Sequence, residues 1–348
     1  VLLPYGLEFA AAGAAFGAVP GSLTGLVVLG GFYRYYKKQW RDEECALPGA
    51  QLTPARRLIK RLLLLALPVS CANVIVPVTS SIDVMLVPKY LLAAGFSVKE
   101  ATTQFGYLAG MAQPLLLMAT IPTMSLATSL VPAVSEAMAL KRWPLIEEKL
   151  ATAMKLCCLI TVPAAVGMSA LAGPISRLLY GTGEAAAAIM HSGPAIWFLG
   201  LQQVTTGMLQ GMGHTNLPML HMLAGIVAKL IAVCQLTNAE YGIAGAAWAT
   251  NINFGVTAAL NILALQYFKI KFHWLSICKI ILAAFVMGAA AQALHGLLAG
   301  FNYTLATLAA LSGAGVVYAA LLPLLRIISV AELKQLPLVK KLAQKLRK

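Results

Sequence analysis

The strongest constraint on this chain is a series of long apolar stretches that recurs along almost its whole length. A stretch of about 20 apolar residues is long enough to cross a membrane as a helix. Inside a membrane every backbone amide must be hydrogen-bonded within the protein, which leaves helices or a closed barrel. The stretches show no strict alternation of apolar and polar residues, so a barrel is excluded. Only 11% of the residues are charged, against roughly 25% in a soluble domain. The chain is therefore predicted to be an all-α polytopic membrane protein.

Nine transmembrane helices are predicted from these stretches. They cover residues 7–33, 58–88, 102–138, 145–172, 184–210, 216–236, 242–268, 275–297 and 303–326. Of the 26 lysines and arginines, 22 fall at alternate connections or in the C-terminal tail. Because lysine and arginine are retained on the cytoplasmic side, this side is predicted to be the cytoplasm. We therefore expect a multi-pass protein of the cell membrane with a cytoplasmic C-terminus.

This distribution accounts for the net charge of +14 without a nucleic-acid partner, which would require a basic patch on one surface. The six cysteines and five histidines show no ligand spacing, so neither a metal site nor a cofactor is expected. The sequence contains no Ser-His-Asp set, paired catalytic carboxylates or P-loop, which disfavours hydrolysis and ATP coupling. A membrane enzyme would need an acidic or histidine constellation near a loop, and the sequence offers none.

The two ends of the chain carry separate expectations. The sequence has no initiator methionine and opens on VLLPYGLEFA, in which Val1 to Leu3 look like the tail of a helix that stops at Pro4. We therefore expect it to begin part-way through a longer protein. Residues 327–348 combine leucines on one helical face with lysines around them. Such a basic amphipathic segment is expected to rest on the anionic cytoplasmic leaflet; a solvated tail is the alternative.

Charged side chains inside the predicted spans are few, and four of them are candidates for a functional site: Glu8, Asp83, Glu136 and Lys229. A charge in hydrocarbon is costly unless it is paired, so each should face other protein groups or water. Glu8 and Glu136 lie at span ends, where an interfacial position is open to them. Asp83 is predicted within about 8 Å of the outer end of its span, and Lys229 roughly 10 Å below that boundary.

Four amide side chains, Gln202, Gln203, Asn251 and Asn253, complete the set of candidates for contact with a substrate or coupling ion. Hydrogen bonding between helices is the simpler interpretation for most of them, and a hydrophilic cavity is the alternative. Lys229 has two interpretations as well. Its charge is either structural, held by carbonyls or a carboxylate, or it contacts an anionic substrate or forms a gating pair with an acidic residue.

Three stretches carry a family resemblance. They are LATSLVPAVSEAMALKRWPLIEEKL at 126–150, ISRLLYGTGEA at 175–185 and GIAGAAWATNINFGVTAALNILAL at 242–265. Together they resemble the multidrug/oligosaccharidyl-lipid/polysaccharide exporter superfamily, and they are most similar to its stage V sporulation protein B and lipid II flippase branch.

The resemblance implies the C-terminal part of a fourteen-helix, two-lobe transporter. Residues 1–35 would then hold the last helix of the first lobe, whose earlier helices are missing. A basic cytoplasmic loop between the lobes would follow at 36–57, the second six-helix lobe at 58–268, two additional helices at 275–326 and the tail at 327–348.

The resemblance also implies a function. A monomeric transporter would move a lipid-linked sugar, such as an undecaprenyl diphosphate saccharide, by alternating access, while the lipid tail stays among membrane lipids. Superfamily members often carry a lysine in the helix matching 216–236, commonly followed four residues later by asparagine. Lys229 matches this lysine, but the asparagine position is Val233. The alternative is a cation-coupled multidrug antiporter of the same superfamily, for which Asp83 would be the exchanging carboxylate.

Overall fold

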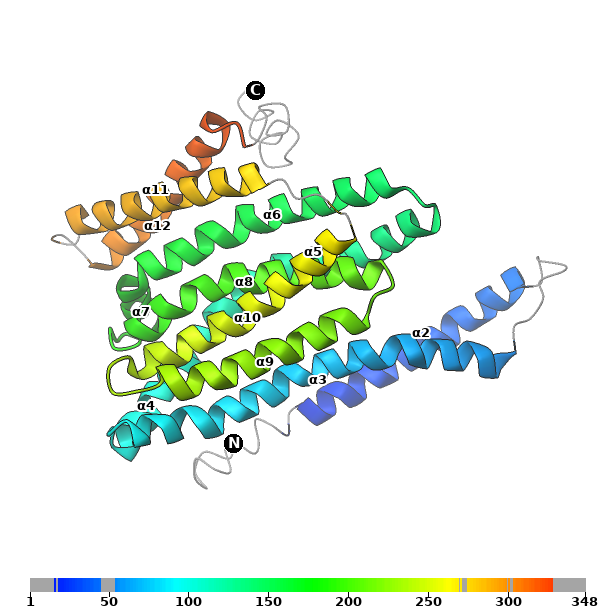
Figure 1. Cartoon of the computed structure of the whole chain (residues 1–348), viewed down its shortest axis with the longest axis horizontal. Helices are drawn as coiled ribbons and strands as arrows, with labels where there is room; N and C mark the ends of the chain where they lie inside the picture. The colour runs from blue at the N-terminus through cyan, green and yellow to red at the C-terminus, as the bar shows by residue number, and fades with distance from the viewer. Residues whose placement is uncertain are drawn as a thin grey trace. The chain divides into compact units, whose positions relative to one another are not determined.

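The computed structural model describes residues 16, 18–44, 54–268, 270, 274–298, 300 and 303–327. The chain divides into two units, Val1–Leu62 and Leu63–Lys348, and in the described ranges every regular element is helical (Figure 1). The helices are α2 (Ala18–Glu44), α3 (Ala55–Ala93), α4 (Val98–Gly106), a π-helical segment (Tyr107–Ala112), α5 (Gln113–Ala139), α6 (Trp143–Ala170), α7 (Ala172–Tyr180), α8 (Ala186–Gly211), α9 (Asn216–Leu236), α10 (Gly242–Tyr267), α11 (Trp274–Leu298) and α12 (Tyr303–Leu324).

The long helices follow the predicted spans closely. Residues 216–236 form α9 as predicted, and the predicted span 145–172 becomes α6 at Trp143–Ala170. Five helical segments in the described ranges are long and apolar enough to cross a membrane: Val98–Ala139, Trp143–Ala170, Asn216–Leu236, Trp274–Leu298 and Tyr303–Leu324. A polytopic helical membrane protein is therefore confirmed, whereas the nine spans and the fourteen-helix arrangement stay predictions.

Two boundaries differ from the prediction. Helix α2 continues to Glu44, past the predicted span end at 33, and α3 continues through Pro88 to Ala93. Hydropathy reports where an apolar stretch ends, whereas backbone hydrogen bonding can carry a helix further into polar residues. The short helix α7 lies in the predicted connection between the spans 145–172 and 184–210. Its last carbonyls are capped at Gly181, which has a positive φ of 71°, as is common after a helix C-terminus.

The predicted span 102–138 forms one continuous helical segment that starts at Val98 and changes its winding on the way. Its first turn carries a capping box, in which the Ser97 and Glu100 side chains each bond the other residue's backbone N–H. The π-helical segment Tyr107–Ala112 interrupts the α-helical hydrogen bonding, and Pro114 follows at the start of α5. Neighbouring side chains stabilise this change of winding: the Tyr180 hydroxyl donates to the Met111 carbonyl at 2.9 Å.

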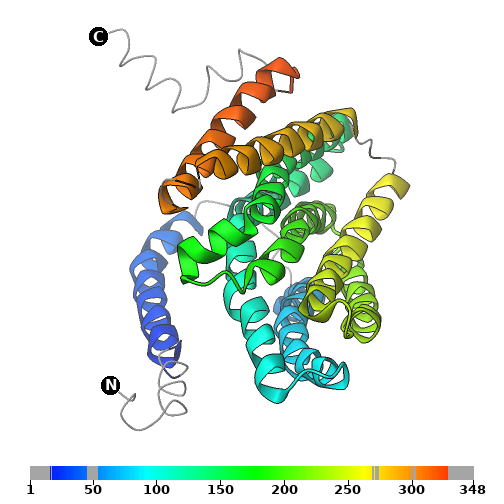
Figure 2. The same cartoon turned by 90° about the vertical axis from the view of Figure 1, so that its left-hand side faces the viewer.

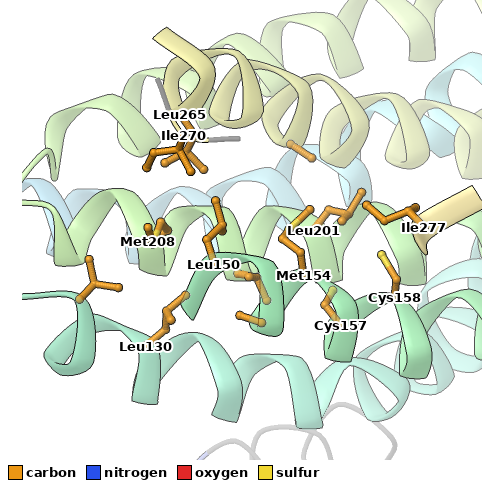
Figure 3. Packing of buried hydrophobic residues seen from close by; sticks show 14 of the residues in the cluster. Leu130, Leu150, Met154, Cys157, Cys158, Leu201, Met208, Leu265, Ile270 and Ile277 are labelled. Carbon is orange, nitrogen blue, oxygen red and sulfur yellow. The ribbon is translucent and has the colours of Figure 1, made fainter. Parts of the chain in front are cut away.

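Helix α8 lies at the centre of the second unit, in contact with α5, α6 and α10. Two glycines allow this close approach: a Cβ at Gly200 would lie 2.6 Å from Thr161 of α6, and one at Gly207 would lie 2.6 Å from the Ala127 carbonyl of α5. The side chains that fill one of the two large apolar clusters come from α5, α6, α8, α10 and α11 (Figure 3). Two hairpins complete the unit, α9 with α10 and α11 with α12, and both pairs lie side by side in Figures 1 and 2.

Candidate functional site

The candidate site is a buried ion pair between Asp83 of α3 and Lys229 of α9. The Lys229 Nζ atom lies 2.5 Å from Asp83 Oδ2, and the two residues are only 4% and 7% exposed. Two charges removed from water in this way are stable only because each neutralises the other. In the structure a carboxylate holds the Lys229 charge, which fits both a structural pair and a gating pair. Nothing in the local sequence pairs these two residues.

Asp83 lies further from the end of its helix than from the predicted end of its span at Pro88. Because α3 runs to Ala93 and not to Pro88, Asp83 lies about 15 Å of helical rise from the end of its helix. Lys229 lies about 10 Å from the end of α9 at Leu236, as predicted. Both charges are therefore well inside their helices, where the cost of leaving either one unpaired is highest.

A second contact joins the same two helices. The Cys234 thiol of α9 donates to the Tyr90 hydroxyl oxygen of α3 at 2.9 Å. Since Tyr90 follows Asp83 along α3 and Cys234 follows Lys229 along α9, the two helices run in the same direction, as the predicted topology requires. The ion pair and this hydrogen bond together join α3 to α9, two helices that are drawn next to each other in Figure 1.

Helix α9 also packs tightly on α10. A Cβ at Gly225 would lie 2.3 Å from Thr257 Oγ1 and 2.6 Å from Asn253 Oδ1, so only glycine fits there. Gly225 and Lys229 are four residues apart and share one face of the helix. Asn253, which is 9% exposed, therefore packs on α9 one helical turn before Lys229.

The remaining predicted amides join α8 to its neighbours. The Thr123 hydroxyl of α5 donates to Gln203 Oε1 at 2.6 Å, and Asn251 Nδ2 donates to the His191 carbonyl of α8 at 2.8 Å. Gln202 is 7% exposed, and its Oε1 atom has no hydrogen-bond partner among the described residues. Gln203 and Asn251 thus form hydrogen bonds between helices, as the simpler interpretation expects.

The predicted carboxylates at the span ends do not join the site. Glu136 is exposed near the end of α5, and Glu8 lies outside the described residues, as does most of the basic tail. Within the described ranges no group of three or more His, Cys, Asp and Glu side chains is placed to hold a metal ion.

One polar cluster was missed by the sequence prediction. Asn261 of α10, which is fully buried, contacts His221 of α9 and both Thr205 and Thr206 of α8. A signal for it was present in the sequence, because Asn253, Thr257 and Asn261 recur every four residues and so form a polar stripe on one face of a helix.

Comparison with known proteins places the chain in a family. The lipid II flippase MurJ family matches residues 100–311, which include all of α5 to α10. This chain belongs to the lipid II flippase MurJ family. The resemblance inferred from the three sequence stretches is thereby confirmed, and the family is one of transporters rather than enzymes.

Individual relatives agree with the family assignment. The membrane protein YabM of Bacillus subtilis (strain 168) is 30% identical over 260 residues, which cover 75% of this chain and 48% of that protein. Stage V sporulation protein B of the same organism is 28% identical over 98% of this chain and 66% of its own length. The chain thus spans between about half and two thirds of these relatives. A solved MOP superfamily transporter from Pyrococcus furiosus aligns at a TM-score of 0.46 with 15% identity over 74% of this chain and 60% of that chain.

Proposed function

We propose that this MurJ-family chain belongs to a flippase that moves a lipid-linked oligosaccharide or peptidoglycan precursor across the cytoplasmic membrane by alternating access. The match to the lipid II flippase family over residues 100–311 carries this proposal. The substrate would be an undecaprenyl diphosphate saccharide, whose head group crosses through the protein while its chain stays in lipid. The transporter would act as a monomer, with its C-terminus in the cytoplasm.

The Asp83–Lys229 pair has the properties of a latch in such a cycle. Alternating access requires helices to separate on one side of the membrane and close on the other. Two side-chain contacts, the ion pair and the Tyr90–Cys234 hydrogen bond, join α3 to α9. Since neither charge is stable alone in the membrane, α3 can separate from α9 only when other groups neutralise both.

A diphosphate is suited to release this latch. Its oxygens can accept hydrogen bonds from the Lys229 ammonium and take the place of the Asp83 carboxylate, which then binds a proton or a cation. The head group would thus be bound only in the state in which α3 and α9 are free to separate. The substrate would therefore bind more tightly when α3 and α9 are separated than when the ion pair joins them. A ligand can drive a change of conformation only through such a difference in affinity.

The same pair argues against the multidrug antiporter. A cationic drug that bound Asp83 would have to take the place of the Lys229 ammonium, which lies 2.5 Å from the carboxylate. The Lys229 charge would then be left without a partner. Asp83 is also the only carboxylate that is buried in the described residues.

Complementation of a bacterial strain depleted of its own lipid II flippase tests the proposed function. We expect the wild-type protein to restore growth. The Asp83→Asn/Lys229→Met variant, which leaves no unpaired charge, should be present in the membrane at the wild-type level and fail to restore growth. The control Lys89→Gln, which changes an exposed lysine of α3, should restore it. The proposal is wrong if the wild-type protein fails to restore growth but protects cells from a cationic dye.

A further inference from the structure

The His221 cluster joins three helices at one level of the second unit. His221 lies five residues after the start of α9, Thr206 five residues before the end of α8, and Asn261 six residues before the end of α10. At 1.5 Å of rise per residue each is within about 10 Å of its helix end. In the predicted topology these ends face the cytoplasm, on the opposite side of the membrane from the nearer ends of Asp83 and Lys229.

The hydrogen bonds of this cluster have a defined direction. The Thr205 hydroxyl donates to the Leu201 carbonyl at 2.7 Å, which leaves its oxygen free to accept. Asn261 Nδ2 donates to Thr205 Oγ1 at 3.1 Å and to Thr206 Oγ1 at 3.0 Å. Both amide protons are thereby used, so the Asn261 Oδ1 atom, which faces His221, can only accept.

The direction of these bonds fixes the state of the imidazole. The His221 Nδ1 atom lies 2.7 Å from Asn261 Oδ1, and because that oxygen is an acceptor, Nδ1 must carry the proton. In a neutral imidazole the other ring nitrogen, Nε2, is then unprotonated. His221 is only partly buried, so part of the residue's surface is accessible.

The helices that contact His221 carry few charged side chains. Helices α8 and α10 contain no Asp, Glu, Lys or Arg; their titratable groups are His191, near the far end of α8, and Tyr267, at the end of α10. Helix α3 carries no charged residue between 62 and 82. On the chain segment of His221 itself, His214 precedes it by seven residues, and Lys229, paired with Asp83, follows it by eight.

We propose that His221 is a proton-binding site, at which Nε2 takes a proton from bulk water while Nδ1–H stays bonded to Asn261. Protonation breaks no hydrogen bond of the cluster. It turns the Nδ1–H···Oδ1 contact into a charge-assisted hydrogen bond, which is roughly twice as strong as a neutral one. Acidification therefore tightens the junction of α8, α9 and α10 at this level, and deprotonation loosens it.

The first test is NMR of the protein labelled with ¹⁵N and ¹³C in histidine and placed in lipid nanodiscs. The His221 signal, assigned by its loss in the His221→Gln variant, should show the Nδ1–H form at high pH and a charged ring at low pH. The Asn261→Leu variant removes the acceptor and should convert the neutral ring to the Nε2–H form; the His191→Gln variant, the control, should leave the His221 signal unchanged. A wild-type Nε2–H form, or a ring that keeps one charge state from about pH 5 to pH 8, would overturn the proposal.

Transport supplies the second readout. If the proposed flippase function holds, wild-type transport should change with cytoplasmic pH, whereas the His221→Gln variant should transport at equal rates at low and high pH. If His221→Gln does not fold, Asn261→Asp assigns the signal instead, because a carboxylate at this position should keep the ring charged to higher pH. The NMR result does not depend on transport, so failure of the proton site and failure of the flippase function are distinguishable.

Discussion

Removing one charge of the Asp83–Lys229 pair should destabilise the protein more than removing both. The pair is 2.5 Å apart and its residues are 7% and 4% exposed, so a single substitution leaves an unpaired charge out of contact with water. Such a charge costs about 3–5 kcal/mol. Asp83→Asn keeps an oxygen that can accept from Lys229 and should fall near the lower value. Lys229→Met keeps the aliphatic stem but leaves the carboxylate without a donor, and should fall near the upper value.

The double variant Asp83→Asn/Lys229→Met carries no charge at this position. Replacing a buried ion pair by neutral groups of similar volume is often close to neutral, so we expect a loss of about 1 kcal/mol or less. The measurement is the free energy of unfolding in mixed micelles titrated with SDS. Lys89→Met, at an exposed lysine of α3, is the matched control and should stay within about 0.5 kcal/mol of wild type. Single costs under about 1 kcal/mol, or single costs that add up in the double variant, would refute this reasoning.

Three further predictions address packing and orientation. Gly225→Ala should lower the free energy of unfolding by about 1–3 kcal/mol, because the new Cβ would lie 2.3 Å from Thr257 Oγ1. The control Gly296→Ala, whose Cβ would meet nothing within 4 Å, should not be destabilising. Equal losses in the two variants would contradict the close packing of α9 on α10. Gln203→Leu removes the bond to Thr123 and should cost about 0.6 kcal/mol, with about 1.7 kcal/mol as the upper limit, in the same unfolding assay. In single-cysteine variants, a membrane-impermeant maleimide added to intact cells should label exposed Cys234 and not buried Cys157; labelling of Cys234 only in inside-out vesicles would reverse the predicted topology.

Helix positions were predictable because each long apolar stretch must form its own hydrogen-bonded helix in a membrane. Helix α9 begins and ends where its apolar stretch does. The ends of α2 and α3 were not predictable in this way, since both helices continue into residues that hydropathy assigns to loops.

The candidate site was predictable residue by residue but not as pairs. Lys229 and Asp83 each stand out as charges inside apolar stretches, but their contact depends on which helices become neighbours. They are 146 residues apart in the chain, and no local pattern determines that neighbourhood. The His221–Asn261 cluster was missed for the same reason, although its polar stripe on α10 is visible in the sequence.

Transport of a lipid-linked substrate in vesicles tests the central claim most directly. The purified protein would be reconstituted in proteoliposomes with a fluorescent undecaprenyl diphosphate saccharide, and the fraction of head groups moved across the bilayer would be measured. We expect movement by wild type and by Lys89→Met, and none by the Asp83→Asn/Lys229→Met variant, which is folded but lacks the ion pair. Movement by that double variant at the wild-type rate would show that the ion pair takes no part in transport, and no movement by wild type would contradict the flippase function.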